Sequence, residues 1–420
     1  MRVHFVLFGS IVLLCGCGDD SESQADAALD TTPDDIVDGS DLEALDTPRD
    51  RIGRDATVPT MEYDHACVTD VRVAFDAVPT GGSVMAAWSG NVGDPDSVMP
   101  WPRYTSNVAN SFGLQNHLQG VARLRAGSFV AFAGSNPHSD IGDLFIGYLP
   151  SRSGAGRWGS NLTERPHPLD AAVTVAQPDV TDALALAIGV DPDYWHAGGI
   201  STLGDLLAVA DERSGASRVA FFDVSDPMAP VLLTPTIDRA DDKASAVGIV
   251  RVADGRYVVI TRNDHHADTY VSRTDRFADG FDSTAYARWD GDAVGGDFTA
   301  FYGSETITLV RQCDNQFFLV GFGNTSSSAP VVAGQDNAYL YSVVYPGADL
   351  TESPTLTEIA RKTVGCGSGR TAACNFDAGA SVFVTDAGEL VFYGVFHFRV
   401  PLVAADDNRN GPMILRLAEF

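Results

Sequence analysis

Six polar side chains give this sequence its candidate chemistry. They are imidazole, carboxylate and ammonium groups, which exchange protons or bind charged and hydroxylated ligands. All six lie close to the ends of predicted strands, where loops on a rigid scaffold often hold functional side chains. The six are His117, His196, Asp211, Lys243, Asp264 and Asp377. They suit a ligand-binding site and, as the alternative, the active site of a hydrolase.

No motif of a known catalytic site accompanies these residues. The sequence lacks the G-x-S-x-G nucleophile elbow, the HExxH zinc motif, the P-loop and the dinucleotide-binding fingerprint. A hydrolase of glycans or phosphate esters would therefore need residues from several repeats. The leading hypothesis is a non-enzymatic protein that binds a partner protein or an extracellular ligand such as a carbohydrate. A purely structural envelope protein is the third hypothesis.

One segment near the C-terminus has the pattern of a calcium-binding loop. Asp406, Asn408 and Asn410 offer side-chain oxygens at alternate positions, and Gly411 follows them. Leu417 stands where such a loop usually carries its acidic last residue, and Asx residues with glycine also form ordinary turns. Calcium is the one cofactor that the sequence suggests, with a plain turn as the alternative.

A repeat of four predicted strands accounts for most of the chain. Apolar runs joined by short turns rich in Gly, Asp and Asn indicate successive β-hairpins. The first strands of five copies are 120–124, 199–203, 248–252, 307–311 and 380–384. The second strands are 128–134, 206–211, 256–262, 316–322 and 389–395. The third strands are 143–149, 218–224, 268–274, 338–344 and 413–419.

These copies predict an all-β chain folded as a β-propeller, whose closed ring protects the strand edges. Fourth strands are predicted at 183–190, 230–237, 284–290 and 355–364. The fifth copy ends at Phe420 without a fourth strand, and the segment 71–78, VRVAFDAV, has the pattern to supply it. We therefore predict five blades, with this N-terminal strand completing the C-terminal blade. A six-bladed ring with a degenerate blade in 79–113 is the alternative.

The propeller arrangement brings the six candidate residues to one face. The innermost strand of each blade starts at the face to which the loops between second and third strands return. We call this the top face, and the site is expected there, at the mouth of the central channel. Tyr194 and Trp195 precede His196, where they would cover the seam between blades or stack on a sugar ring. The seam is the favoured interpretation.

Two short patterns resemble exported bacterial propellers. The segment 217–233, SRVAFFDVSDPMAPVLL, resembles the LVIVD-type repeat, in which a strand ends in a turn of this kind. The segment 196–200, HAGGI, is similar to the H-x-G-G-[IL] start of a blade in uncharacterised exported propellers. The resemblance covers one blade, and it implies the fold and export rather than a particular reaction.

The N-terminus has the features of a lipoprotein signal peptide over residues 1–17. Arg2 precedes an apolar run, and the run ends in Leu-Cys-Gly-Cys, which resembles a lipobox and implies lipidation of Cys17. Gly18 offers no inner-membrane retention signal, so we expect a lipid-anchored protein of the bacterial cell envelope, at the outer membrane or the cell surface. Asp19 leaves the choice of membrane open.

An acidic tether is predicted over residues 18–60, before the propeller domain at 61–420. Thirteen acidic and three basic residues lie between Asp19 and Asp55, a composition typical of disordered chain. The whole sequence has a formal net charge of −28, which disfavours nucleic acid as a partner. The expected partners are the membrane, through the lipid, and a protein or carbohydrate ligand.

The remaining cysteines predict two disulfides. Removal of Cys15 with the signal and lipidation of Cys17 leave four cysteines in the exported domain. Cys366 and Cys374 flank a short loop, GSGRTAA, and are predicted to pair with each other. That pairing leaves Cys67 for Cys313.

Overall fold

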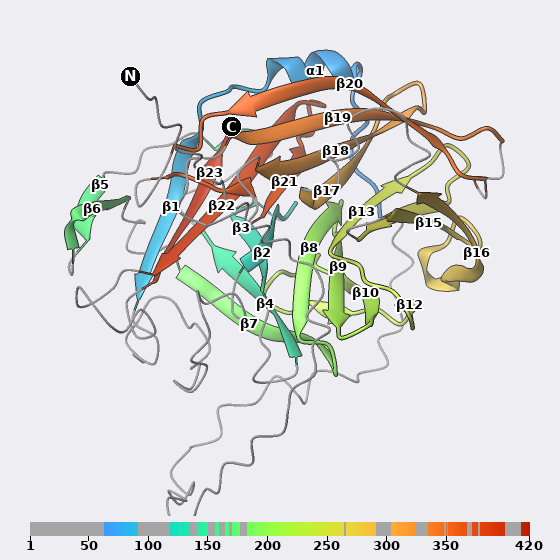
Figure 1. The fold of residues 1–420 in the computed structure, drawn as a ribbon, viewed down its shortest axis with the longest axis horizontal. Helices are drawn as coiled ribbons and strands as arrows, with labels where there is room; N and C mark the ends of the chain where they lie inside the picture. The colour runs from blue at the N-terminus through green and yellow to red at the C-terminus, as the bar shows by residue number, and fades with distance from the viewer. Residues whose placement is uncertain are drawn as a thin grey trace, which may run out of the picture.

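Five antiparallel sheets arranged around one axis make up the computed structural model of the protein, which is a five-bladed β-propeller. The innermost strands surround the axis and the outer strands lie at the periphery (Figure 1). The predicted fold class and the five blades are confirmed. The structure describes residues 63–90, 118–125, 127–134, 141–149, 156–158, 164–167, 170–176, 183–263, 266–290, 304–324, 335–347, 350, 352–367, 372–376, 379–399 and 413–420.

Blades 1 to 4 follow one another along the chain, each with its strands in order outward from the axis. Blade 1 contains β2 (Leu118–Arg123), β3 (Phe129–Gly134), β4 (Ile141–Tyr148) and β7 (Ala183–Pro192), with the hairpin β5 (Glu164–His167) and β6 (Asp170–Ala176) inserted. Blade 2 contains β8 (His196–Leu203), β9 (Leu206–Arg213) and β10 (Ala216–Asp223), on which the short β11 (Val231–Leu232) and β12 (Ile237–Arg239) pair. Blade 3 contains β13 (Ala246–Arg251), β14 (Tyr257–Arg262), β15 (His266–Ser272), the 3-10 turn η3 (Phe277–Asp279) and β16 (Phe281–Asp290). Blade 4 contains β17 (Ser304–Arg311), β18 (Phe317–Asn324), β19 (Asp336–Val344) and β20 (Thr355–Val364).

Blade 5 closes the ring with an N-terminal strand, although not with the predicted one. It contains β21 (Ala380–Val384), β22 (Leu390–Arg399), β23 (Met413–Glu419) and β1 (Ser83–Gly90), and β1 pairs antiparallel with β23. The segment 71–78 instead contains helix α1 (Val71–Ala77). The prediction of N-terminal closure is confirmed, but the assignment of its strand to 71–78 is wrong.

Helix α1 forms because its apolar residues and its caps suit a short helix. Val71 and Phe75, four residues apart, are both buried in the cluster shared with blades 4 and 5. The Asp70 carboxylate accepts a hydrogen bond from the Val73 amide at 2.9 Å and caps the N-terminus. The Lys362 ammonium donates to three carbonyl oxygens at the other end. Neither α1 nor any other described helix is long and apolar enough to cross a membrane.

Alternating residues of a strand fill the two interfaces of its blade. In β9, Leu206 and Ala208 belong to the cluster between blades 2 and 3, whereas Leu207 and Val209 belong to the cluster between blades 1 and 2. All four side chains are buried. A strand covered on both faces needs apolar residues at successive positions. This explains why the strands appear in the sequence as continuous apolar runs.

Glycines bring the innermost strands into direct contact near the top of the axis. A Cβ atom on Gly198 would lie 2.5 Å from the Ser245 carbonyl oxygen, and one on Gly120 would lie 2.8 Å from the Gly198 carbonyl oxygen. A Cβ on Gly379 would lie 3.0 Å from the Gly120 Cα. Blades 5, 1, 2 and 3 therefore meet backbone to backbone at this level. The top of the axis is narrow.

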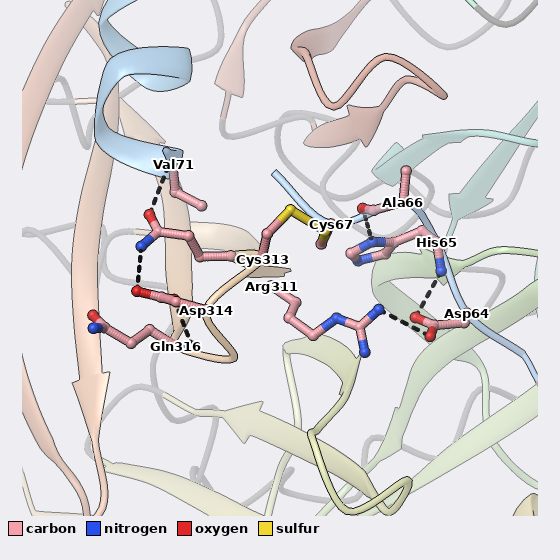
Figure 2. Close-up of a disulfide and its surroundings, with 10 residues drawn as sticks. Asp64, His65, Ala66, Cys67, Val71, Arg311, Cys313, Asp314 and Gln316 are labelled. Atoms are coloured by element: carbon pink, nitrogen blue, oxygen red, sulfur yellow. Dashed lines mark hydrogen bonds and ion pairs between the residues drawn. A yellow bond between two sulfur atoms is a disulfide. The ribbon is translucent and has the colours of Figure 1, made fainter. Parts of the chain in front are cut away.

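Both predicted disulfides are confirmed, Cys67–Cys313 and Cys366–Cys374, each with a Cα–Cα distance of 4.9 Å. They indicate a protein of an oxidising compartment. The first disulfide fastens residues 63–68, which we call the N-terminal strap, to the turn between β17 and β18 (Figure 2).

The N-terminal strap crosses the bottom face, the face opposite the top. Its Tyr63 hydroxyl donates to the Asp223 carboxylate of blade 2 at 2.9 Å. Its Asp64 carboxylate accepts from the Arg311 guanidinium of blade 4 at 3.0 Å (Figure 2). The strap therefore joins blades 2 and 4 from below.

Candidate functional site

Three of the six predicted site residues lie in the described part of the chain, all at the top face. His196 begins β8, Asp211 lies near the end of β9, and Lys243 precedes β13. The other three, His117, Asp264 and Asp377, lie outside the described residues, as do Cys17 and the calcium-loop residues Asp406, Asn408 and Asn410. The paired strands β8 and β9 bring His196 and Asp211 to neighbouring positions, whereas Lys243 belongs to blade 3.

His196 is held by Glu212, its cross-strand partner. The two residues are opposite each other in the register of β8 and β9, and His196 Nδ1 lies 3.1 Å from Glu212 Oε2. The Trp195 ring lies against the imidazole, with 5.1 Å between ring centroids. Because the ring is fixed on two sides, His196 is positioned rather than mobile.

Asp211 is a sealed carboxyl group between blades 1 and 2. Its side chain is completely buried, and neither carboxylate oxygen accepts a close hydrogen bond from the described residues. Burial, followed by the charge of nearby Asp191, raises the pKa of Asp211 well above its usual value. The carboxyl group is completely buried, so a ligand on the surface cannot reach it.

Arg218 forms an exposed ion-pair group on the top face of blade 2. Its guanidinium lies 2.5 Å from Asp191 Oδ2 and 2.5 Å from Asp238 Oδ1. The Tyr194 ring lies beneath Arg213 and Arg218, at 5.0 and 5.1 Å from their guanidinium carbons. Tyr194 is buried, which fits a side chain covering the seam and leaves no open ring face for a sugar.

A second charged group, the arginine–aspartate cluster, joins blades 2 and 3 at the top face. It consists of Arg239, Asp242, His266, Asp268 and Arg288. Arg239 from β12 lies 2.6 Å from Asp268 Oδ2 and 3.0 Å from Asp242 Oδ2. Arg288 from β16 lies 2.8 Å from Asp268 Oδ1 and 2.6 Å from Asp242 Oδ2. The two carboxylates are thus held between two guanidinium groups.

His266 and Asp242 complete this cluster. His266 Nε2 lies 2.6 Å from Asp242 Oδ2, and the Asn263 amide donates to Asp242 Oδ1 at 2.6 Å. Burial alone would raise the pKa of Asp242, but Arg239 and His266 hold it below its usual value. The cluster therefore favours the ionised form of Asp242 and fixes the orientation of Arg288, whose side chain is 44% exposed.

The cluster contains a metal-like spacing but does not fit a metal ion. Ligand atoms of Asp242, His266 and Asp268 lie within 4.8 Å of one another, close enough for one ion. Arg239 and Arg288 contact the same carboxylate oxygens. A cation placed there would face two guanidinium charges at short range, which oppose its binding. The carboxylates of Asp242 and Asp268 form ion pairs with the two arginines instead.

The arginine–aspartate cluster was not predicted from the sequence. Arg239 ends the short strand β12 at the outer edge of blade 2, and Arg288 lies near the end of β16, the outermost strand of blade 3. The available signal was the register of β15 and β16, which places Asp268 opposite Arg288. An Asp and an Arg at matching positions of adjacent predicted strands indicate a cross-strand ion pair.

A cavity of about 270 Å³ lies at the bottom end of the axis. Its walls come from the ends of β8, β17 and β21, from the turn after β2 and from the N-terminal strap. The lining includes Asp64, His65, Arg125, Thr202, Thr308 and Asp386 with an apolar wall of Leu309, Val382, Phe383 and Val384.

Several solved structures share low similarity with this chain. No protein-family model matches it, and no curated protein matches it. A putative hydrolase from Bacteroides ovatus has 10% identity over 72% of this chain and 85% of its own, with a TM-score of 0.32. The WD40 domain of Toxoplasma gondii coronin has 10% identity over 81% and 87%, with a TM-score of 0.26. The NanB sialidase of Streptococcus pneumoniae has 11% identity over 84% and 60%, with a TM-score of 0.28.

Proposed function

We propose that this chain is a lipid-anchored binding protein of the cell envelope, and that it recognises a partner protein through the top face of blades 2 and 3. The observation that carries the proposal is the pair of charged groups held there in fixed geometry. Arg218, Asp238 and Arg288 are 29%, 59% and 44% exposed, and each is oriented by an ion pair. Side chains ordered before binding lose less entropy on binding.

The chemistry of this surface suits a protein better than a small molecule. Arginine is enriched among the residues that contribute most to protein interfaces, and complementary charges select the partner. Arg218 and the arginine–aspartate cluster lie on adjacent blades around a top whose axis is narrow. They place charged side chains on two adjacent blades, where a partner protein of complementary charge can contact both.

The position of the N-terminal strap is consistent with a binding surface on the top face. In this proposal Cys17 carries the lipid and residues 18–60 form the tether. Tyr63, the first described residue, contacts blade 2 at the bottom face. The described chain therefore begins at the bottom face, opposite the proposed binding surface. The hydrolase hypothesis receives no such support from the described residues, because the Asp211 carboxyl is sealed.

Matched arginine variants test this proposal. Arg218 on the top face and Arg256 on the bottom turn of blade 3 are 29% and 24% exposed, and each pairs with an aspartate. The wild-type chain and the variants Arg218→Ala and Arg256→Ala are expressed in the native host, and co-purified proteins are quantified after cross-linking. We expect one partner to be lost with Arg218→Ala and with the surface charge reversal Asp238→Lys, but kept with Arg256→Ala. Equal recovery with all variants would refute the proposal.

A further inference from the structure

We infer that the cavity at the bottom of the axis binds a small, uncharged polyhydroxylated ligand of monosaccharide size. This site is separate from the proposed top-face function and does not depend on it. The cavity is bounded by four of the five blades, all except blade 3, and by the N-terminal strap. Its volume of about 270 Å³ lies just below the range of drug-sized pockets and suits a smaller molecule.

The N-terminal strap, which forms part of the cavity lining, is held in place by several contacts. Asp64 Oδ1 accepts from the His65 amide at 2.8 Å, while Asp64 Oδ2 accepts from Arg311 at 3.0 Å (Figure 2). The His65 Nδ1–H donates to the Ala66 carbonyl oxygen at 2.7 Å, and burial lowers the pKa of His65. Its ring is therefore neutral. Cys67, the next residue but one after His65, is fixed by its disulfide to Cys313. This part of the lining is therefore ordered before a ligand enters.

The walls of the cavity combine hydroxyl groups with apolar surface. Thr202 on β8 is half-buried at the cavity. Thr308 on β17 accepts from the Val382 amide through its oxygen at 3.3 Å, which leaves its hydroxyl proton to donate. Leu309 and Phe383 lie on the same lining. A sugar ring presents hydroxyl groups at its edge and C–H groups on its faces, and it matches such a wall.

The charges around the cavity disfavour an anionic ligand. The Asp64 charge is balanced by Arg311, and Arg125 lies 4.0 Å from Asp205 at the rim. Asp386, on the turn between β21 and β22, then adds an exposed carboxylate to the lining. A carboxylate accepts strong hydrogen bonds from hydroxyl groups and repels anions. A neutral polyol can donate hydrogen bonds to this carboxylate, whereas the carboxylate would repel a sugar acid or a phosphate.

The test is a titration of the full chain with glucose, galactose and N-acetylglucosamine, with glucuronate as the anionic comparison. Binding is followed by calorimetry and by saturation-transfer NMR to about 10 mM, tenfold above a Kd of about 1 mM. We expect at least one neutral sugar to saturate the protein, and glucuronate to bind more weakly. Failure of all three neutral sugars to saturate, or tighter binding of glucuronate, would overturn the inference.

Variants then place the ligand. Thr202→Val removes one hydroxyl at nearly constant volume and is expected to weaken binding about five- to tenfold, while Asp386→Asn weakens it about tenfold or more. Thr357→Val on the exposed face of β20 is the matched control and should bind like the wild type. Asp386 is exposed, so its variant folds even if Thr202→Val does not. Unchanged sugar binding in Asp386→Asn, or an equal loss of sugar binding in Thr357→Val, would contradict the assignment of the ligand to this cavity.

Discussion

Asp336 makes the folding stability of the propeller depend on pH in an unusual direction. The residue begins β19, is 3% exposed, and accepts hydrogen bonds at Oδ1 from the Phe376 amide at 2.8 Å and from Asn324 Nδ2 at 3.0 Å. Burial outweighs these bonds and raises the pKa of Asp336 from 3.8 to about 6. Between pH 4 and 6, the native chain therefore keeps a proton that the unfolded chain has released.

Stability must then fall as the pH rises through this window. A shift of about two units at about 1.36 kcal/mol each predicts a loss of about 3 kcal/mol in the free energy of unfolding between pH 4 and 7. Asp336→Asn keeps an oxygen for both donors and cannot ionise. The difference in unfolding free energy, variant minus wild type, should rise by about 3 kcal/mol over the same interval.

Urea unfolding of both proteins at pH 4, 5, 6 and 7 measures this difference. The comparison within one pair matters because burial also raises the pKa values of Asp211 and Asp191. Those groups titrate equally in the wild type and in the variant, so they cancel. A flat difference would refute the reasoning, and a difference that falls with pH would show that the two hydrogen bonds outweigh burial.

Three further predictions concern the packing of the ring. Gly198→Ala places a Cβ 2.5 Å from the Ser245 carbonyl oxygen and should destabilise the fold by about 1–3 kcal/mol or more in a thermal melt. Gly81→Ala has no atom within 4 Å of the new Cβ and should be neutral in the same measurement. Arg239→Ala leaves Asp268 buried with one partner fewer and should cost about 3–5 kcal/mol in urea unfolding; a cost near zero would contradict the cluster. Replacing Cys67 and Cys313 by alanine should cost about 2–5 kcal/mol and free the strap for limited proteolysis, whereas a strap that stays protected would show that Tyr63 and Asp64 hold it alone.

The blades could be predicted from the sequence because each strand has its own local signal. The second strands of the repeats, such as 206–211, are apolar on both faces and follow short turns rich in glycine, aspartate and asparagine. The four-strand order then defines the ring. Segment 71–78 was assigned wrongly because VRVAFDAV fits two periodicities. The helix is favoured by the Asp70 cap and by the burial of Val71 and Phe75 on one face.

The charged surface and the cavity could not be predicted in the same way. Arg239, Asp268 and Arg288 come from three strands of two blades, and their contact depends on the broken end of blade 2. The cavity needs the ends of several inner strands together with the strap. No fixed spacing of residues along the sequence marks either the arginine–aspartate cluster or the cavity. His196 and Asp211 could be predicted as candidates because they lie at the ends of predicted strands. The burial of Asp211 could not be predicted, because it depends on the packing of blades 1 and 2.

Site-specific photo-cross-linking tests the central claim most directly. A photoreactive amino acid replaces Asp241, an exposed residue beside Asp242 on the top face, or Asp254, an exposed residue on the bottom face. The proteins are irradiated in cells of the native host and analysed by mass spectrometry. We predict a discrete protein adduct from position 241 and none from position 254. An adduct from position 254 alone, or the same adducts from both positions, would contradict recognition through the top face.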